Sequence, residues 1–71
     1  MKRRARIERR LILGLADGST VTLDRGVCWI DPDGENPTVI WEGGDGLESG
    51  PISAEEVSLH LARRNFVFTS W

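Results

Sequence analysis

The sequence has no long hydrophobic run and only one cysteine. The apolar stretch Leu11–Leu15 is too short for the core of a signal peptide and far too short to span a bilayer. Cys28 has no second cysteine to pair with, which excludes a disulfide within the chain and argues against a cysteine-rich secreted scaffold. These two absences predict a soluble, cytoplasmic protein.

Positive charge is missing from half of the chain, because no Lys or Arg occurs between Gly26 and Ala62. The same region carries eight carboxylates: Asp31, Asp33, Glu35, Glu42, Asp45, Glu48, Glu55 and Glu56. The first ten residues show the opposite bias, with six Lys or Arg residues against a single Glu8. The net charge of −2 therefore conceals a basic end and an acidic region. Such segregation bears on partners and association more than on fold.

Motifs that carry chemistry are also missing. Cys28 lies in an apolar run and His60 lies between two leucines, so packing explains both better than catalysis does. One Cys and one His do not supply a zinc site without carboxylates, and no metal-ligand spacing is present. The segment 43–46 lacks the Lys-Ser/Thr ending of a phosphate-binding loop. We expect no enzymatic activity, no cofactor and no metal.

The N-terminal half has the alternating pattern of β-strands. From Ile7 to Leu15 the apolar residues recur at every second position, except at Arg9, which predicts one half-buried strand. Asp17-Gly18 follows as a hairpin turn, and 20–24 is the second strand. The segment 27–30 is either a continuation of that strand or a separate one, because Gly26 interrupts the pattern.

The second half of the chain predicts another hairpin, a loop and a helix. The turn formers of 31–37 precede a strand over 38–42, and the glycine-rich segment 43–51 is interpreted as a mobile surface loop. Ser53 and Glu56 form a capping-box sequence, so we expect a helix over 53–64 with Asn65 as a left-handed cap. Alternation over Phe66–Trp71 predicts a last strand.

These elements predict an α+β fold: a small antiparallel sheet of three to five strands with one helix packed on a face, in the order β-β-β-α-β. Residues 1–71 form a single small domain, and residues 1–6 are expected to be a flexible basic arm. The other face or an edge strand of the sheet is then available to a partner.

The leading functional hypothesis is a non-enzymatic regulator or inhibitor that binds a larger protein or nucleoprotein complex with a basic surface. The expected contact residues are Asp31, Asp33, Glu35, Glu42, Asp45 and Glu48. In size and charge, though not in motifs, the chain resembles the accessory and inhibitor proteins of bacteriophages and mobile elements, including anti-CRISPR proteins.

Two alternatives remain open. The first is a nucleic-acid-binding protein whose basic arm contacts phosphates through Arg3, Arg4, Arg6, Arg9 and Arg10. The second is a structural subunit that pairs with itself through an open strand such as 66–71, as a homodimer rather than a monomer. The sequence leaves open whether the basic and acidic parts act on one target.

Overall fold

The computed structural model describes residues 1–69, and within them the chain forms two antiparallel sheets and one helix. The elements are β1 (Arg3–Ile7), β2 (Leu11–Gly14), β3 (Thr20–Leu23), β4 (Gly26–Asp31), β5 (Thr38–Gly43), β6 (Gly46–Pro51), α1 (Ala54–Ala62) and β7 (Phe66–Phe68). Five strands form a sheet in the order β6-β5-β4-β1-β7, and β2 pairs with β3 as a separate hairpin. The α+β class with a single helix on a sheet is confirmed, although the chain has more strands than the order β-β-β-α-β predicts.

The N-terminal residues are part of the large sheet. The expected flexible arm over residues 1–6 is wrong from Arg3 onwards, because β1 pairs with β4 on one side and with β7 on the other. Ala5, in the middle of β1, is fully buried. The expected single strand over Ile7–Leu15 is instead the end of β1 and the whole of β2, which lie in different sheets. Arginines flank Ala5 in the sequence. Because of these charged residues, the alternation of buried and exposed positions in β1 was not recognised as a strand pattern.

Two further strands correct the sequence interpretation. The segment 27–30 belongs to a separate strand, β4, which pairs with β1 and β5. The segment 43–51, expected to be a mobile loop, instead makes a tight turn and continues as β6, which pairs with β5 along its whole length. Gly46, with φ +119°, occupies a backbone conformation in that turn that other residues rarely adopt. Leu47 is the only large aliphatic residue of β6, so this strand lacks the hydrophobic alternation that predicts a strand.

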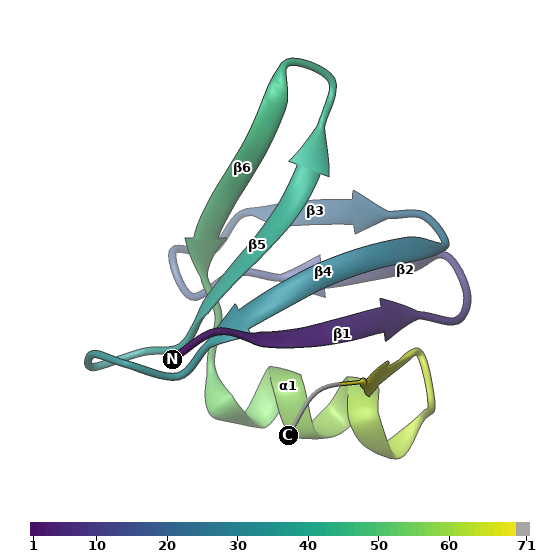
Figure 1. Ribbon diagram of the computed structural model, residues 1–71. Helices are drawn as coiled ribbons and strands as arrows, with labels where there is room; N and C mark the ends of the chain where they lie inside the picture. The colour runs from purple at the N-terminus through teal and green to yellow at the C-terminus, as the bar shows by residue number, and fades with distance from the viewer. Residues whose placement is uncertain (70–71) are drawn as a thin grey trace.

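The core lies on one face of the five-stranded sheet, which we call the inner face. Figure 1 shows the β2–β3 hairpin stacked behind the sheet and α1 lying along its lower side. The buried apolar residues are Ala5, Ile7, Leu11, Leu13, Leu23, Cys28, Ile30, Val39, Ile52 and Phe66. The opposite, outer face of the sheet is covered by no element within residues 1–69.

The helix begins as the sequence predicts but uses its residues differently. Ser53 is the N-cap, and its Oγ accepts the Glu56 N–H at 3.1 Å. The Glu56 carboxylate does not return to the cap; it accepts the Gly14 N–H of β2 at 2.9 Å. At the other end Arg64, rather than Asn65, adopts the left-handed conformation, with φ +59°. A long-range contact to the hairpin therefore replaces one half of the capping box, while the bond between Ser53 and the Glu56 N–H is kept.

Candidate partner-binding site

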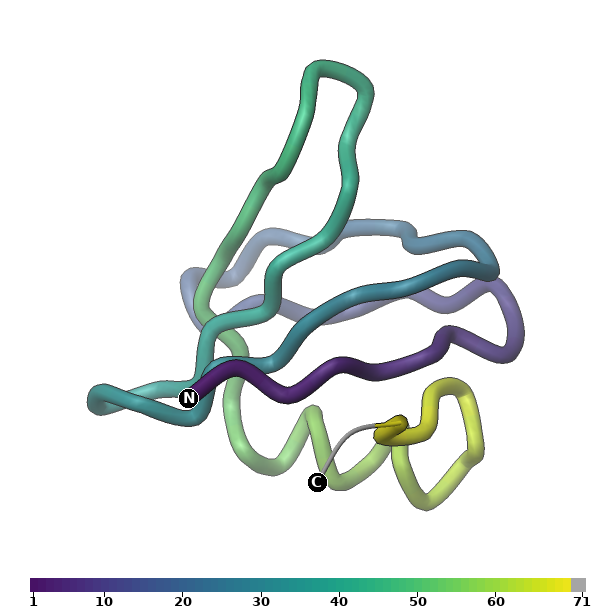
Figure 2. Tube along the Cα trace, in the orientation of Figure 1, coloured from purple at the N-terminus to yellow at the C-terminus, as the bar shows by residue number. Residues whose placement is uncertain are grey.

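The six acidic residues expected to form one surface lie in two separate groups. Asp31, Asp33 and Glu35 lie at the turn between β4 and β5, and we call them the turn group. Glu42, Asp45 and Glu48 lie at the end of the β5–β6 hairpin, and we call them the tip group. The six-residue strand β5 separates the two groups by about 17 Å at about 3.3 Å per residue. Figure 2 shows the two turns at opposite ends of β5.

The turn group lies next to positive charge. The Met1 ammonium contacts the Asp33 carboxylate and lies 3.7 Å from Asp31 Oδ1. Hydrogen bonding to that ammonium holds the pKa of Asp33 below its usual value. Arg3 is paired with Ile30 in the neighbouring strand, one residue before Asp31. The basic and acidic regions of the sequence therefore meet at this end of the sheet and partly neutralise each other.

The tip group has no such compensation. Within residues 1–69, none of its three carboxylates forms an ion pair within 4.0 Å. Leu47, between Glu42 and Glu48, is 66% exposed. In Figure 1 the β5–β6 hairpin projects beyond the rest of the molecule. The tip group thus combines uncompensated negative charge with an exposed apolar side chain.

A cleft of about 520 Å³ lies below the tip, between the β5–β6 hairpin and β3. Its lining includes Ile7, Val21, Leu23 and Trp41, together with residues 42–44 and Glu48. The Glu48 side chain lies across Gly43, where a Cβ would come within 1.6 Å of Glu48 Oε2. Glycine at position 43 therefore gives this carboxylate its place on the inner face.

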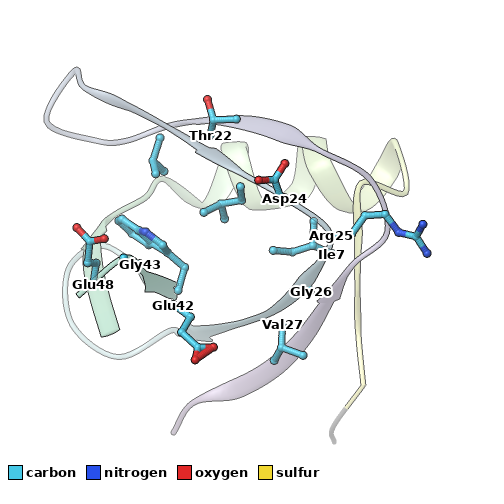
Figure 3. Close-up of a pocket in the computed structure, with 13 residues that line it drawn as sticks. Ile7, Thr22, Asp24, Arg25, Gly26, Val27, Glu42, Gly43 and Glu48 are labelled. Atoms are coloured by element: carbon cyan, nitrogen blue, oxygen red, sulfur yellow. The ribbon is translucent and has the colours of Figure 1, made fainter. Parts of the chain in front are cut away.

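Figure 3 shows how the charged residues around the cleft are oriented. The Arg25 side chain extends away from the cavity. Glu42 and Val27 point together to the outside of the sheet, as expected for residues on its outer face. Asp24 forms an exposed ion pair with Arg10, with 3.1 Å between Arg10 Nε and Asp24 Oδ1. Glu48 is therefore the uncompensated charge on the inner side of the cleft.

The five arginines expected to form a basic arm point in different directions. Arg3 faces the inner side, where its guanidinium lies 3.8 Å from the centre of the Phe68 ring. Arg4 and Arg6 face the outer side, and Arg6 binds Glu8 at 2.9 Å. Arg9 and Arg10 lie between β1 and β2, outside the five-stranded sheet. The structure therefore does not bring the five together as one phosphate-binding arm.

The outer face carries an aromatic residue that the sequence interpretation did not assign to a surface. Directly opposed residues of antiparallel strands share a face, so Arg4, Trp29 and Ile40 form one row across β1, β4 and β5. Arg6 and Val27 form the next row. The buried Cys28 and Ile30 were the available signal, because alternation places the intervening Trp29 on the opposite face.

Cys28 and His60 have structural roles. Burial raises the pKa of the Cys28 thiol to about 11, so it is not a nucleophilic thiolate at neutral pH. His60 is only 4% exposed, and both ring nitrogens are engaged: Nε2 with Glu56 at 3.0 Å and Nδ1 with the Asn65 side chain at 2.8 Å. No ring nitrogen of His60 is left to activate a nucleophile.

The strand expected for self-association is at the edge of the sheet. β7 pairs with β1 on one side, and within residues 1–69 no strand pairs with its other side. It has three residues where the sequence suggested six, and residues 70 and 71 of that interpretation lie outside the described part of the chain. A three-residue edge offers few backbone groups for pairing.

Comparison with known proteins gives no relative to reason from: no protein-family model, no curated protein and no solved structure matches this chain. In the described part of the chain the single helix, α1, has nine residues, and it is not long and apolar enough to cross a membrane. Function is therefore argued from the geometry of the surfaces themselves.

Proposed function

We propose that this protein is a non-enzymatic regulator or inhibitor that binds a basic surface of a larger protein through the tip group, Glu42, Asp45 and Glu48. The observation that carries the proposal is the tip of the β5–β6 hairpin, where the exposed Leu47 is paired with Glu42 and none of the three carboxylates forms an ion pair within residues 1–69. Leu47 supplies an apolar contact, and the carboxylates supply long-range attraction to a basic partner. The turn group takes a smaller part, because the Met1 ammonium and Arg3 lie beside it.

Matched charge-reversal variants test this proposal. The tip variant carries Glu42→Lys and Asp45→Lys, and the turn variant carries Asp33→Lys and Glu35→Lys, so both change the net charge equally. Each protein is used to capture partners from nuclease-treated lysate of the cells that express it, and the captured proteins are quantified by mass spectrometry. We expect a defined partner that the wild type and the turn variant retain and the tip variant loses.

The association rate of that purified partner provides the quantitative check. Reversal of the tip charges is expected to slow association about tenfold at low salt, with a smaller difference at high salt, because the attraction is screened. Equal retention and equal rates for the two variants would contradict a tip-centred binding site.

One observation favours nucleic acid as a second candidate partner. On the outer face, which no element within residues 1–69 covers, Trp29 lies beside Arg4, and single-stranded nucleic acid binds to surfaces that combine aromatic side chains with positive charge. Arg6 adds charge to the same face, although Glu8 binds it. Glu42 lies at the far side of this face, and its carboxylate would repel phosphate groups, so nucleic acid is only the second candidate.

Fluorescence polarisation with a labelled single-stranded oligonucleotide tests this candidate. We expect Trp29→Ala to weaken binding about tenfold through the loss of stacking, and Arg6→Gln to reduce the salt dependence. Lys2→Gln, an exposed change outside the described strands, is the control. Equal affinity of the Trp29 variant and the wild type would exclude the outer face as the binding surface.

A further inference from the structure

The outer edge of β3 has no strand beside it within residues 1–69. In an antiparallel hairpin the residues alternate between pairs whose backbone groups bond across the strands and pairs whose groups point away. The Leu15 N–H donates to the Ser19 carbonyl at 2.8 Å, so this pair bonds across the hairpin. The alternation then makes the N–H and C=O groups of Thr20 and Thr22 point away from β2. The Gly14 N–H, opposite Thr20, does point away from β3, since it donates to Glu56.

This open edge borders the cleft below the tip. The hairpin contributes only two strands, and the inner face of the five-stranded sheet is not fully covered by them (Figure 1). Trp41 lies at the end of the covered area: its neighbour Cys28 in β4 is fully buried, whereas Trp41 is half-buried and lines the cleft. A further strand beside β3 would cover Trp41 and extend the core.

The charge of the cleft indicates which kind of strand it would accept. Glu48 is paired with Trp41 across β5 and β6, and its carboxylate lies on the inner face over Gly43. No cation within residues 1–69 forms an ion pair with Glu48, and Arg25, which also lines the cleft, points away from it. A basic side chain in the cleft would complement this carboxylate.

We propose that the cleft binds an extended peptide segment of a basic partner, which adds to the edge of β3 as a third strand. Alternate side chains of a strand point to the same face, so one apolar side chain would lie over Trp41 and a Lys or Arg two positions along would meet Glu48. The backbone groups of Thr20 and Thr22 supply the affinity common to strand addition, and the two side-chain contacts supply selectivity. The inference rests on the proposed function, because it describes the form of the partner segment held next to the tip group.

Selection from a displayed library of random short peptides tests the proposal, with immobilised wild-type protein as the target. We expect enriched peptides that alternate apolar with other residues and carry Lys or Arg two positions from an apolar one. The selected peptide is then titrated into 15N-labelled protein. Protection of the Thr20 and Thr22 amides from exchange and a shift of the Trp41 indole signal are expected, since these groups line the edge and the cleft.

Thr22→Pro is the deciding variant. It removes an N–H that points away from the hairpin, so the β2–β3 ladder keeps its hydrogen bonds, and proline is tolerated at such edge positions. Thr22→Val is the matched control, because it keeps the N–H. We expect Thr22→Pro to weaken the selected peptide about tenfold or more and Thr22→Val to leave its affinity within about twofold. Glu48→Gln should weaken basic peptides and leave uncharged ones unchanged.

Several results would overturn the inference. Failure to enrich any sequence, unchanged amide exchange at Thr20 and Thr22, or equal binding by Thr22→Pro and Thr22→Val would each do so. A concentration-dependent dimer that protects the same amides without peptide would assign the edge to a second copy of this chain instead. Because the amide exchange is measured on the wild type, the test does not depend on the proline variant being folded.

The same variants separate this inference from the proposed function. The Glu42 side chain points away from the cavity and Asp45 does not line it, so reversal of these two charges tests the tip group apart from the Glu48 carboxylate in the cleft. Loss of the captured partner on reversal of Glu42 and Asp45, with full retention by Thr22→Pro, would overturn strand addition and leave the proposed function in place. The opposite pattern would support strand addition and contradict the tip group as the main contact.

Discussion

Glu56 shows how one residue comes to serve a contact that its local sequence does not suggest. In a capping box its carboxylate would bind the backbone of residue 53. Here it accepts the Gly14 N–H and contacts His60 Nε2, so it joins α1 to the edge of β2. Asn65 continues the chain of contacts by binding His60 Nδ1, and its carbonyl accepts the Glu8 N–H. Through Glu56 and Asn65, the buried His60 belongs to a hydrogen-bond network that reaches β2 and the segment after β1.

Loss of the Glu56 carboxylate is expected to destabilise the fold. Glu56→Ala leaves the Gly14 N–H and His60 Nε2 without their acceptor, which should cost about 2 kcal/mol of unfolding free energy. Glu55→Ala, an exposed change in the same helical turn, is the control and should cost less than about 0.5 kcal/mol. Urea denaturation measures both. Equal losses for the two variants would show that the contact to Gly14 contributes nothing.

The charge of Glu56 should also make stability depend on pH. The hydrogen bond from Gly14 lowers the pKa of Glu56 below its usual value of 4.5. A carboxylate with a lowered folded-state pKa stabilises the protein fully above pH 4.5 and loses that contribution as the pH falls through the folded-state value. Glu56→Gln keeps an acceptor but no charge. The stability difference between wild type and Glu56→Gln should therefore be constant near neutral pH and shrink in acid; a constant difference down to acid unfolding would contradict this.

At the scale of elements, turns and edges determine what the strands do. The two hairpin turns were readable, because Asp17-Gly18 and the proline-rich segment 31–37 carry the residues that turns require. The C-terminal cap of α1 was not predictable from the sequence. Asn65 is the residue type expected in the left-handed cap, but its side chain binds His60. Arg64 adopts the left-handed conformation instead, at a steric cost for a residue with a Cβ.

The steric cost of the left-handed conformation of Arg64 is measurable. Arg64→Gly should stabilise the protein by about 0.5–1 kcal/mol, because glycine adopts φ +59° without strain. Arg63→Gly, at the preceding residue with right-handed φ −83°, is the matched control and should destabilise by a similar amount. Thermal unfolding by circular dichroism compares the two. A destabilised Arg64→Gly variant would mean that the Arg64 side chain contributes more than the strain it causes.

At the scale of the whole molecule, the basic N-terminal strand holds the large sheet together. β1 lies between β4 and β7, and Ala5 and Ile7 contribute to the core. The basic residues of β1 therefore cannot be deleted without removing a strand that the fold needs. Removing the basic residues to test nucleic-acid binding would remove a strand with two neighbours, so single arginine substitutions are the sharper test.

Deletion of residues 1–6 should abolish cooperative unfolding. The deletion removes most of β1, leaves β4 and β7 without their shared partner and exposes Phe66 and Cys28. A domain of this size has few kcal/mol to lose. Circular dichroism during heating should show a broad, non-cooperative change, in contrast to the sharp transition of the full chain. A sharp transition close to that of the full chain would mean that β1 is dispensable.

The sequence by itself determined the class of the fold, the hairpin at Asp17-Gly18, the start of α1 at Ser53 and the segregation of charge. Each of these follows from residues close together in the chain: turn formers, a cap and its partner three residues later, and runs of one sign. Only the tertiary structure decided that β1 and β2 belong to different sheets, that Glu56 binds β2, and that the acidic residues form two groups. These depend on contacts between distant segments, and local patterns carry no information about which segments meet. The open edge of β3 is likewise a feature that only the tertiary structure decides, because a strand is at an edge only when its neighbours in the sheet are known.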